Sequence, residues 1–347
     1  MIYINNIKQI SIQEPLSDAW FDDPLYPVTL YNEGKDPDFK QFLPIPIMRR
    51  LGRLLRRATV TSTEVLKGFE AEDLDGIISG TGLGCIENTE KFLTSMIEND
   101  ERYLQPTYFM QSTHNTIGSQ VALYLKCKGY NNTYSHRGTS FDSALFDAYV
   151  QMNLGHLHKV IVGSHDELTP NYFVLLGKSG YWKQDDSQIA TLKDGDSAGS
   201  ISGICSLSAL LSDCLDESSL CKIEGMTMLY KPDEAELETA CSELKRKAGI
   251  AGFDAVVTGI SGDKVNDDVY KSIFSSVYAD APVIWYKHLF GESFSSSAFG
   301  VYTGALCLAN RRVPSHLLYK GECEFPRYIL VHNHFKNKDH SLVLLSL

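Results

Sequence analysis

Short apolar runs alternate with amphipathic stretches along most of the chain. Segments 73–80, 158–163 and 253–258 are apolar runs of strand length, and helical spacing of apolar residues covers 143–154 and 233–248. Parallel strands that helices cover on both faces read as continuous apolar runs. The pattern therefore predicts an α/β protein with covered sheets.

The two ends of the chain also have strand character. Residues 1–8 alternate between apolar and polar positions, which predicts a first strand, and 328–332 with 341–345 predict a closing hairpin. The start lacks the basic and apolar blocks of a signal peptide, and no long uncharged apolar run follows. We therefore expect a cytoplasmic protein without a membrane span.

Amino-acid composition and net charge limit the kinds of partner that the protein is expected to bind. The 347 residues are 43% hydrophobic and 22% charged, as in ordinary globular proteins, and suffice for one large domain or two packed halves. The net charge of −11 disfavours nucleic acid and anionic membranes as main partners.

Eight cysteines are scattered without a Cys-x-x-Cys pair. In a reducing compartment such residues behave as small buried hydrophobes. We expect that role for all of them: Cys85, Cys127, Cys205, Cys214, Cys221, Cys241, Cys307 and Cys323.

An arginine-rich segment at 48–57 contrasts with the acidic chain. Its five arginines are Arg49, Arg50, Arg53, Arg56 and Arg57, and in a helix all but Arg50 would share much of one face. One interpretation is a solvated or structurally paired helix face. The other is a docking patch for an acidic partner, such as an acyl carrier protein.

Two further features suggest a ligand site but lack the residue spacing that such a site requires. The turn at 80–84 has three glycines without the Gly-x-Gly-x-x-Gly spacing, so a plain strand-to-helix turn is expected there. The histidine pairs 156/158 and 332/334 come without further ligands at metal-binding spacing. We expect neither a cofactor nor a metal.

Three segments, 134–142, 258–267 and 287–292, resemble in order and context the three catalytic loops of β-ketoacyl synthases. Other stretches with family-like sequence lie in the expected order, including 77–90 and a C-terminal segment at 335–344. Together they extend over nearly the whole chain.

The resemblance implies a thiolase-like α/β fold. Such proteins have two similar βαβαβ halves in a five-layered α/β/α/β/α arrangement, and they usually dimerise through the first half. We expect the halves to be residues 1–230 and 231–347. Internal duplication is not visible in the sequence itself.

The resemblance also identifies the positions where the family carries its cysteine and two histidines. Here these positions are Gly138, Gly259 and Glu292. The family's lysine and gating phenylalanine are retained as Lys287 and Phe335, although the glycines that flank the phenylalanine are not. A carboxylate at 292 would repel a developing enolate, so we expect an ion pair between Lys287 and Glu292.

A hydroxyl next to the vacant nucleophile position offers another interpretation. Ser140 could act as a nucleophile if a base such as His136 pointed at it. Alternatively, Ser140 caps the helix expected at 141–152.

The loss of all three reactive side chains in otherwise recognisable loops predicts a non-catalytic subunit. The chain resembles the chain-length factors of polyketide and aryl-polyene systems, which pair with an active ketosynthase and act on carrier-bound acyl chains. One alternative is an acyltransferase or hydrolase of changed mechanism that uses Ser140, His136 or Glu292. Another is a homodimeric acyl-binding protein.

Overall fold

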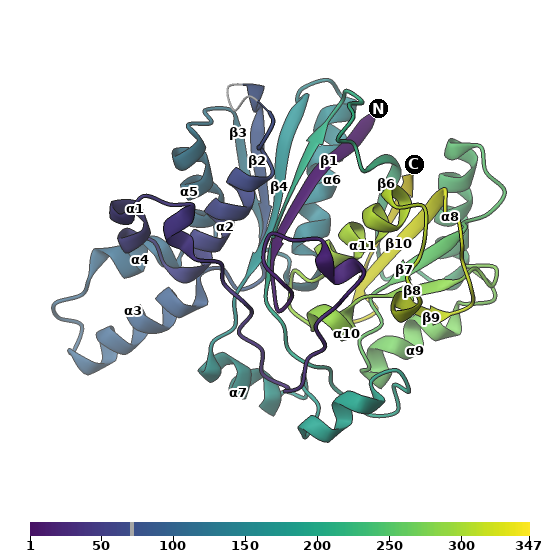
Figure 1. Cartoon of the computed structure of the whole chain (residues 1–347). Coiled ribbons are helices and arrows are strands. Elements are labelled where there is room, and N and C mark those ends of the chain that lie inside the picture. The colour runs from purple at the N-terminus through teal and green to yellow at the C-terminus, as the bar shows by residue number, and fades with distance from the viewer. Residues whose placement is uncertain (70–72) are drawn as a thin grey trace.

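The computed structural model describes residues 1–69 and 73–347, and over these residues eleven strands join in one continuous sheet in the order β3-β2-β4-β5-β1-β6-β11-β10-β7-β8-β9 (Figure 1). The first part of this order holds β1 (Ile2–Ile10), β2 (Gly76–Gly80), β3 (Tyr130–Tyr134), β4 (Lys159–Asp166) and β5 (Cys205–Ser212). The second part holds β6 (Cys221–Tyr230), β7 (Ala255–Thr258), β8 (Val283–Trp285), β9 (Leu318–Lys320), β10 (Tyr328–Phe335) and β11 (Asp339–Ser346).

The two parts of the sheet repeat one topology. In the first, β5 runs antiparallel to β1 and β4, and β2 runs parallel to β4 and β3. In the second, β11 runs antiparallel to β6 and β10, and β7 runs parallel to β10 and β8. Strand β6 pairs with both β1 and β11, so it lies where the two halves meet. The division of the chain between residues 230 and 231 stays a prediction.

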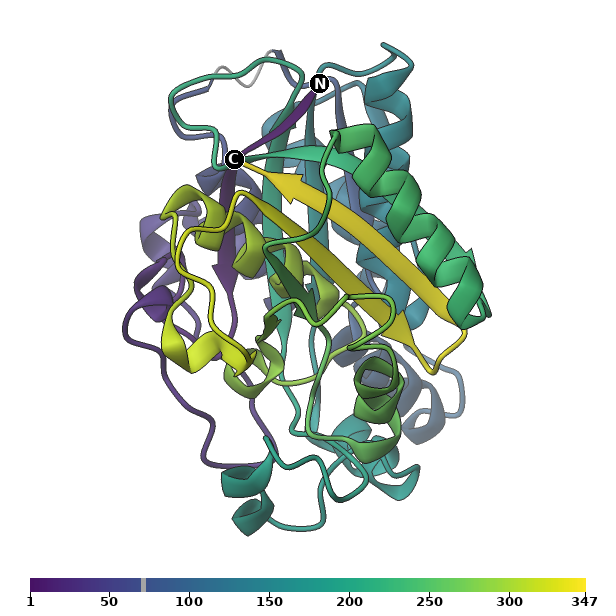
Figure 2. The ribbon, with the colours of Figure 1, turned by 90° about the vertical axis from the view of Figure 1, so that its right-hand side faces the viewer.

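Helices cover the sheet in layers (Figures 1 and 2). Helices α6 (Ser140–Asn153) and α11 (Ser297–Ala309) contact each other and share one core that takes residues from both halves of the sheet. On the outer face of the first half lie α2 (Arg53–Glu64) and α5 (Thr116–Leu125). This arrangement confirms the expected thiolase-like fold, in which five layers alternate between helix and sheet.

The second half has its own outer layer and a set of short helices. Its outer face is covered by α8 (Glu234–Ala248) and α9 (Lys264–Ser272). The remaining α-helices are α1 (Ile45–Arg50), α3 (Ile86–Glu98), α4 (Pro106–Ser112), α7 (Pro170–Lys178) and α10 (Lys287–Phe290). In Figure 1 the α3–α4 pair projects from the side of the first half.

Most elements lie where the sequence predicts them. The strand at the start of the chain and the closing β10–β11 hairpin are confirmed. The helix predicted at 143–154 begins earlier, at Ser140, because a short 3-10 turn at Arg137–Thr139 leads directly into it. The arginine segment forms two helices instead of one, since Leu51 and Gly52 adopt extended backbone between α1 and α2.

Helix α8 shows how local sequence sets an element's ends. The Asp233 carboxylate accepts the Glu236 N–H at 2.8 Å, and the Glu236 carboxylate accepts the Asp233 N–H at 2.9 Å. This reciprocal capping box satisfies two N–H groups that the helix cannot pair internally. At the other end, Gly249 takes a left-handed conformation with a φ of 69°, which glycine adopts without steric cost.

Replacing Asp233 by alanine is expected to lower the free energy of unfolding by about 1 kcal/mol, because the cap of α8 is lost. Denaturant titration at neutral pH measures the change. Glu238→Ala, at an exposed position in the second turn of the same helix, is the matched control and should change stability by about 0.5 kcal/mol or less. Equal effects from the two variants would contradict the capping role.

None of the helices among the described residues is long and apolar enough to cross a bilayer. Within the same residues, no group of three or more potential ligand side chains is arranged to hold a metal ion. The eight thiols are free. Five are buried, Cys127 and Cys323 are half-buried, and Cys214 is exposed, so the expected burial is wrong for Cys214.

Candidate functional site

The three loops singled out in the sequence converge on one cavity of about 510 Å³, which residues from both halves of the chain line. Gly138, Lys287, Glu292 and Phe335 all line it, although they lie up to about 200 residues apart in the chain. Its volume is within the range of about 300–1,000 Å³ that is usual for small-molecule sites.

The first position, Gly138, lies in the short turn that precedes α6. A Cβ atom built at this residue would lie 2.2 Å from Cδ2 of Phe335 and 2.7 Å from its Cγ. These separations are far below van der Waals contact. Phe335 therefore occupies the space that a nucleophilic side chain at position 138 would need.

The second position, Gly259, follows β7 and is closed in the same way. A Cβ atom there would lie 2.5 Å from the hydroxyl of Tyr270, a fully buried residue of α9. That hydroxyl accepts the His334 N–H at 3.0 Å, and burial raises the pKa of Tyr270 far above its usual value. A neutral phenol, fixed by a backbone hydrogen bond, thus lies at the position where the sequence resemblance predicts a catalytic histidine.

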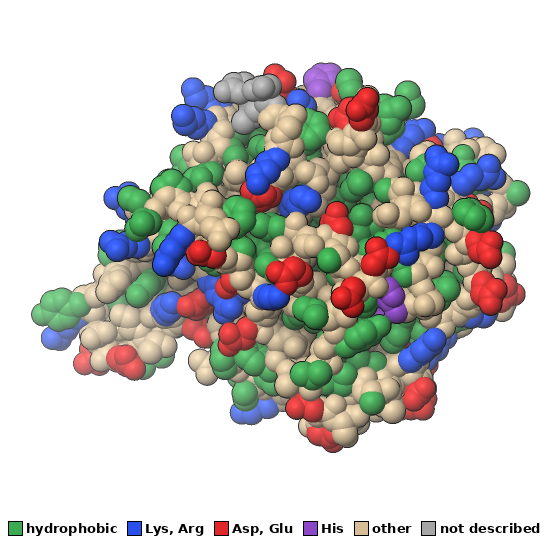
Figure 3. Space-filling view, viewed as in Figure 1, with side chains coloured by type: hydrophobic (Ala, Val, Ile, Leu, Met, Phe, Trp, Pro, Cys, Tyr) green, Lys and Arg blue, Asp and Glu red, His purple; other side chains and the backbone are tan. Residues whose placement is uncertain are grey.

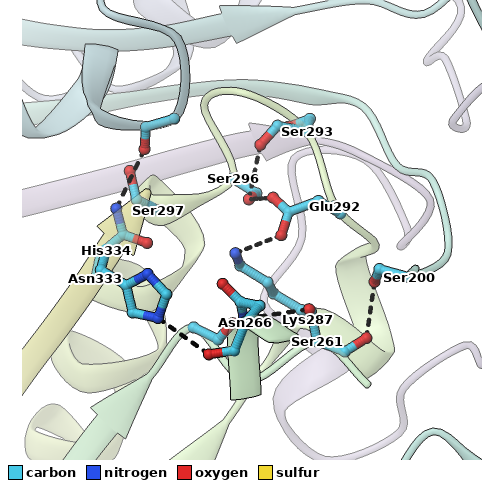
Figure 4. A network of polar contacts seen from close by, with 12 residues as sticks. Ser200, Ser261, Asn266, Lys287, Glu292, Ser293, Ser296, Ser297, Asn333 and His334 are labelled. Carbon is cyan, nitrogen blue, oxygen red and sulfur yellow. Dashed lines mark hydrogen bonds and ion pairs between the residues drawn. The ribbon is translucent and has the colours of Figure 1, made fainter. Parts of the chain in front are cut away.

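The third position carries the predicted ion pair. Lys287 begins the single turn of α10, and Gly291 ends that turn with a φ of 71°. A Cβ atom at Gly291 would lie 2.3 Å from the Ser202 carbonyl oxygen, so only glycine fits. The turn brings Glu292 back onto Lys287, whose Nζ lies 2.6 Å from Glu292 Oε2, which confirms the pairing (Figure 4).

The Lys287–Glu292 pair is supported by further polar groups around the cavity. Ser296 donates its hydroxyl to the second carboxylate oxygen of Glu292 at 2.7 Å. Nearby, His334 Nε2 bonds the Asn266 carbonyl oxygen at 3.1 Å, and Ser200 donates to the Ser261 carbonyl oxygen at 2.7 Å (Figure 4).

Ser140 lies outside this cavity. It is the first residue of α6, fully buried, and its hydroxyl bonds the backbone carbonyl oxygens of Arg137 and Thr81 and the N–H of His136. The predicted capping role is wrong, because no amide of the first helical turn bonds this hydroxyl. The His136 ring bonds the Ser143 hydroxyl at 3.0 Å instead of pointing its Nδ1 at Ser140. The geometry gives Ser140 neither substrate access nor a base.

Two polar residues that the sequence reasoning missed hold the loops together. Asp142 is buried at the start of α6 and accepts hydrogen bonds from Ser297, Asn333 and Ser341. Asn333 also donates to the Gly138 carbonyl oxygen at 3.2 Å. Burial raises the pKa of Asp142 above its ordinary value. In the sequence, Asp142 could have been recognised as a carboxylate on the otherwise apolar face of the predicted helix.

The glycine turn at 80–84 is a structural turn, as the sequence predicts. The carboxylate of Asp166 accepts the backbone N–H groups of Gly82 and Leu83 at 3.0 and 2.8 Å, and the Thr81 hydroxyl at 3.0 Å. The amides that could hold a ligand's phosphate are thus bonded to the protein's own carboxylate.

The five arginines line a separate charged groove of about 980 Å³ together with acidic residues that include Glu33 and Asp36. Arg57 is buried and pairs with Asp36, and Arg53 pairs with both acids. Arg49 and Arg50 are exposed and Arg56 is half-buried. Basic and acidic side chains intermix over this region of α1 and α2 (Figure 3). The structurally paired interpretation therefore holds for Arg53 and Arg57.

Comparison with known proteins finds a similar sequence over part of the chain and a similar fold over nearly all of it. Residues 20–183 match the family model of the β-ketoacyl synthase N-terminal domain, and no curated protein sequence matches the chain. The matched residues make up less than half of the chain, so the match shows a similarity of this segment to that domain.

Solved structures of ketosynthases share the whole architecture. A β-ketoacyl synthase from Burkholderia phymatum STM815 superposes with a TM-score of 0.81 at 14% identity, covering 100% of this chain and 99% of that one. AntDE:AntF, a type II polyketide synthase acyl-carrier protein in complex with its ketosynthase, gives 0.78 at 13% identity, with 99% of each chain covered. The ketosynthase ApeO in complex with its chain length factor ApeC, from Xenorhabdus doucetiae, gives 0.76 at 14%, covering 100% and 98%. At such identities the likeness defines the fold.

Proposed function

We propose that this chain is a catalytically silent, ketosynthase-like subunit of fatty-acid or polyketide biosynthesis, of the aryl-polyene type. In this role it pairs with an active ketosynthase, as a chain-length factor does, and helps to form the space that holds the growing acyl chain. We assign the pair to the cytoplasm as part of the same proposal.

The observation that carries the proposal is that none of the three predicted catalytic positions has a free reactive side chain. Phe335 fills the space at Gly138, and Tyr270 fills the space at Gly259. Glu292 is neutralised by Lys287. A nucleophile needs an ionisable group and a neighbouring base. Gly138 and Gly259 carry no side chain, and the carboxylate of Glu292 is already paired with Lys287. The cavity itself is retained, which favours a binding role over loss of all function.

Two of the similar structures support the choice of partners. One contains a ketosynthase with a chain length factor, and the other contains a ketosynthase with an acyl-carrier protein. For this chain we propose the exposed arginines Arg49 and Arg50, with Arg56 beside them, as the docking patch for an acidic carrier protein. Arg53 and Arg57 would act there by shaping the groove, because their charges already meet Asp36.

Native mass spectrometry tests the proposal. The chain is co-expressed with the ketosynthase encoded nearest to it, and acyl-loaded carrier protein is then added. We expect a one-to-one complex in which the acyl mass appears on the ketosynthase alone. Arg49→Glu with Arg50→Glu should weaken carrier-protein capture but leave the one-to-one complex intact.

Two results would overturn the proposal. An acyl adduct on this chain would favour an enzyme of changed mechanism, and Ser140→Ala, His136→Gln and Glu292→Gln would then locate the reactive group. A stable homodimer that ignores every ketosynthase offered would favour a homodimeric acyl-binding protein.

A further inference from the structure

One part of the cavity lining, called the floor below, is the ion pair of Lys287 and Glu292, which has no net charge. The Lys287 side chain is 4% exposed and its ammonium lies 2.6 Å from the carboxylate of Glu292. The other Glu292 oxygen is bonded by Ser296 at 2.7 Å. The charge of this ammonium is already balanced by a carboxylate, so its net attraction for a second anion is weak.

The remaining charged groups that line the cavity do not supply a free cation on its floor. Asp166 is bonded by the turn at 81–83, and Asp263 accepts the Gly199 N–H at 3.0 Å. Glu167 is buried, and burial raises its pKa to about 7. The other lining cation among the described residues, Lys336, is exposed and lies over the Tyr181 and Phe335 rings.

The walls suit an apolar chain. Tyr181 packs edge-on against Phe294, and Phe294 packs edge-on against Phe335. Aliphatic side chains, including Leu83 and Leu176, complete the lining. A ligand that fills this cavity therefore has an apolar body and a polar end that meets the floor.

From this geometry we propose that the cavity selects acyl groups with an uncharged polar end and rejects those that end in a carboxylate. Glu292 and Lys287 are the specificity-determining pair. A ligand carboxylate near Lys287 would share the site with Glu292, and two carboxylates in one low-dielectric site repel each other. This inference rests on the proposed acyl-chain role and specifies its ligand class.

An uncharged end brings no second charge to the floor. An amide, ketone or hydroxyl end can therefore lie beside Glu292 and leave the ion pair with Lys287 intact.

The test compares two nearly isosteric probes with the isolated chain. Succinamoyl- and succinyl-N-acetylcysteamine thioesters differ only by an amide in place of a carboxylate, and calorimetry measures their binding. We expect the amide to bind at least about ten-fold tighter. In Glu292→Gln, Lys287 loses its partner, and the preference should reverse in favour of the carboxylate.

The double variant Lys287→Met with Glu292→Gln is the matched control, and it should bind both probes within about three-fold. Tighter binding of the carboxylate by the unaltered chain, or binding of neither probe, would overturn the inference. An unchanged preference in Glu292→Gln, with the thermal transition intact, would also do so. These readouts need neither a ketosynthase nor a carrier protein, so they are separate from a failure of the proposed partnership.

Discussion

Introducing a cysteine at position 138, where the sequence resemblance predicts a nucleophile, is expected to destabilise the protein without producing an acylated thiol. The new Cβ atom would lie 2.2 Å from the Phe335 ring, so the ring or the backbone must move. Overpacking of this kind typically costs about 1–3 kcal/mol. We expect Gly138→Cys to lower the free energy of unfolding by that amount and to carry no acyl adduct after exposure to acyl-loaded carrier protein.

Two further variants separate the steric effect from the chemical one. Gly138→Ala has the same Cβ without the thiol, and its stability should fall by a similar amount. Gly138→Cys with Phe335→Ala removes the obstructing ring, so the thiol should become reactive toward iodoacetamide. A stable Gly138→Cys single variant that is readily acylated would mean that Phe335 moves aside freely, and closure of the first position would no longer support a silent subunit.

Stability is expected to fall steeply as the pH drops from about 7.5 to 5.5. Burial lowers the histidine pKa to about 3 for His334 and about 4 for His340, and well below the ordinary value for His332. These three rings lie together behind the Phe335 loop, where His332 bonds Tyr278 at 2.6 Å and His340 at 3.0 Å. Burial also lowers the pKa of His165 and His288 to about 3.

The sign of this pH dependence follows from whether the folded or the unfolded chain binds more protons. Below a pH of about 6.5 these histidines are protonated in the unfolded chain but not in the folded one. Each therefore lowers the free energy of unfolding by about 1.4 kcal/mol per pH unit. Glu167 acts in the opposite direction, because its folded pKa of about 7 lies above the unfolded value. The buried Asp142, Asp166 and Asp267 also have raised pKa values and oppose the loss. We expect a net loss of about 3 kcal/mol or more over the two units.

Urea titrations at several pH values measure this dependence. His340→Gln should flatten the slope by about one histidine's share. His156→Gln, at an exposed position, should leave the slope unchanged. Stability that is constant between about pH 7.5 and 5.5 would contradict neutral burial of the histidine cluster.

The fold was predictable because its signals are local. Apolar runs and helical spacing identified the strands and helices, and the order of the family-like segments identified the thiolase-like architecture. The ion pair between Lys287 and Glu292 was also predictable, since the partners lie only five positions apart and a glycine turn joins them.

The contacts that close the site were not predictable, because they join residues far apart in the chain. Phe335 lies almost 200 residues from Gly138, and only tertiary packing brings its ring there. Arg57 has helical spacing typical of an exposed face, yet it is buried and pairs with Asp36 from a preceding loop. The hydroxyl of Ser140 donates to the Thr81 carbonyl oxygen, a contact that the local sequence pattern does not predict.

The central position of β1 has a consequence for how the chain folds as it is made. Its partners, β5 and β6, begin at Cys205 and Cys221, so nearly 200 residues follow β1 before either exists. At a synthesis rate of roughly 5–20 residues per second, this strand waits about 10–40 s. During that time an apolar segment without hydrogen-bond partners is open to pairing with other chains. Closing the middle of the sheet is therefore a late step in folding, and non-local pairing of this kind makes it slow.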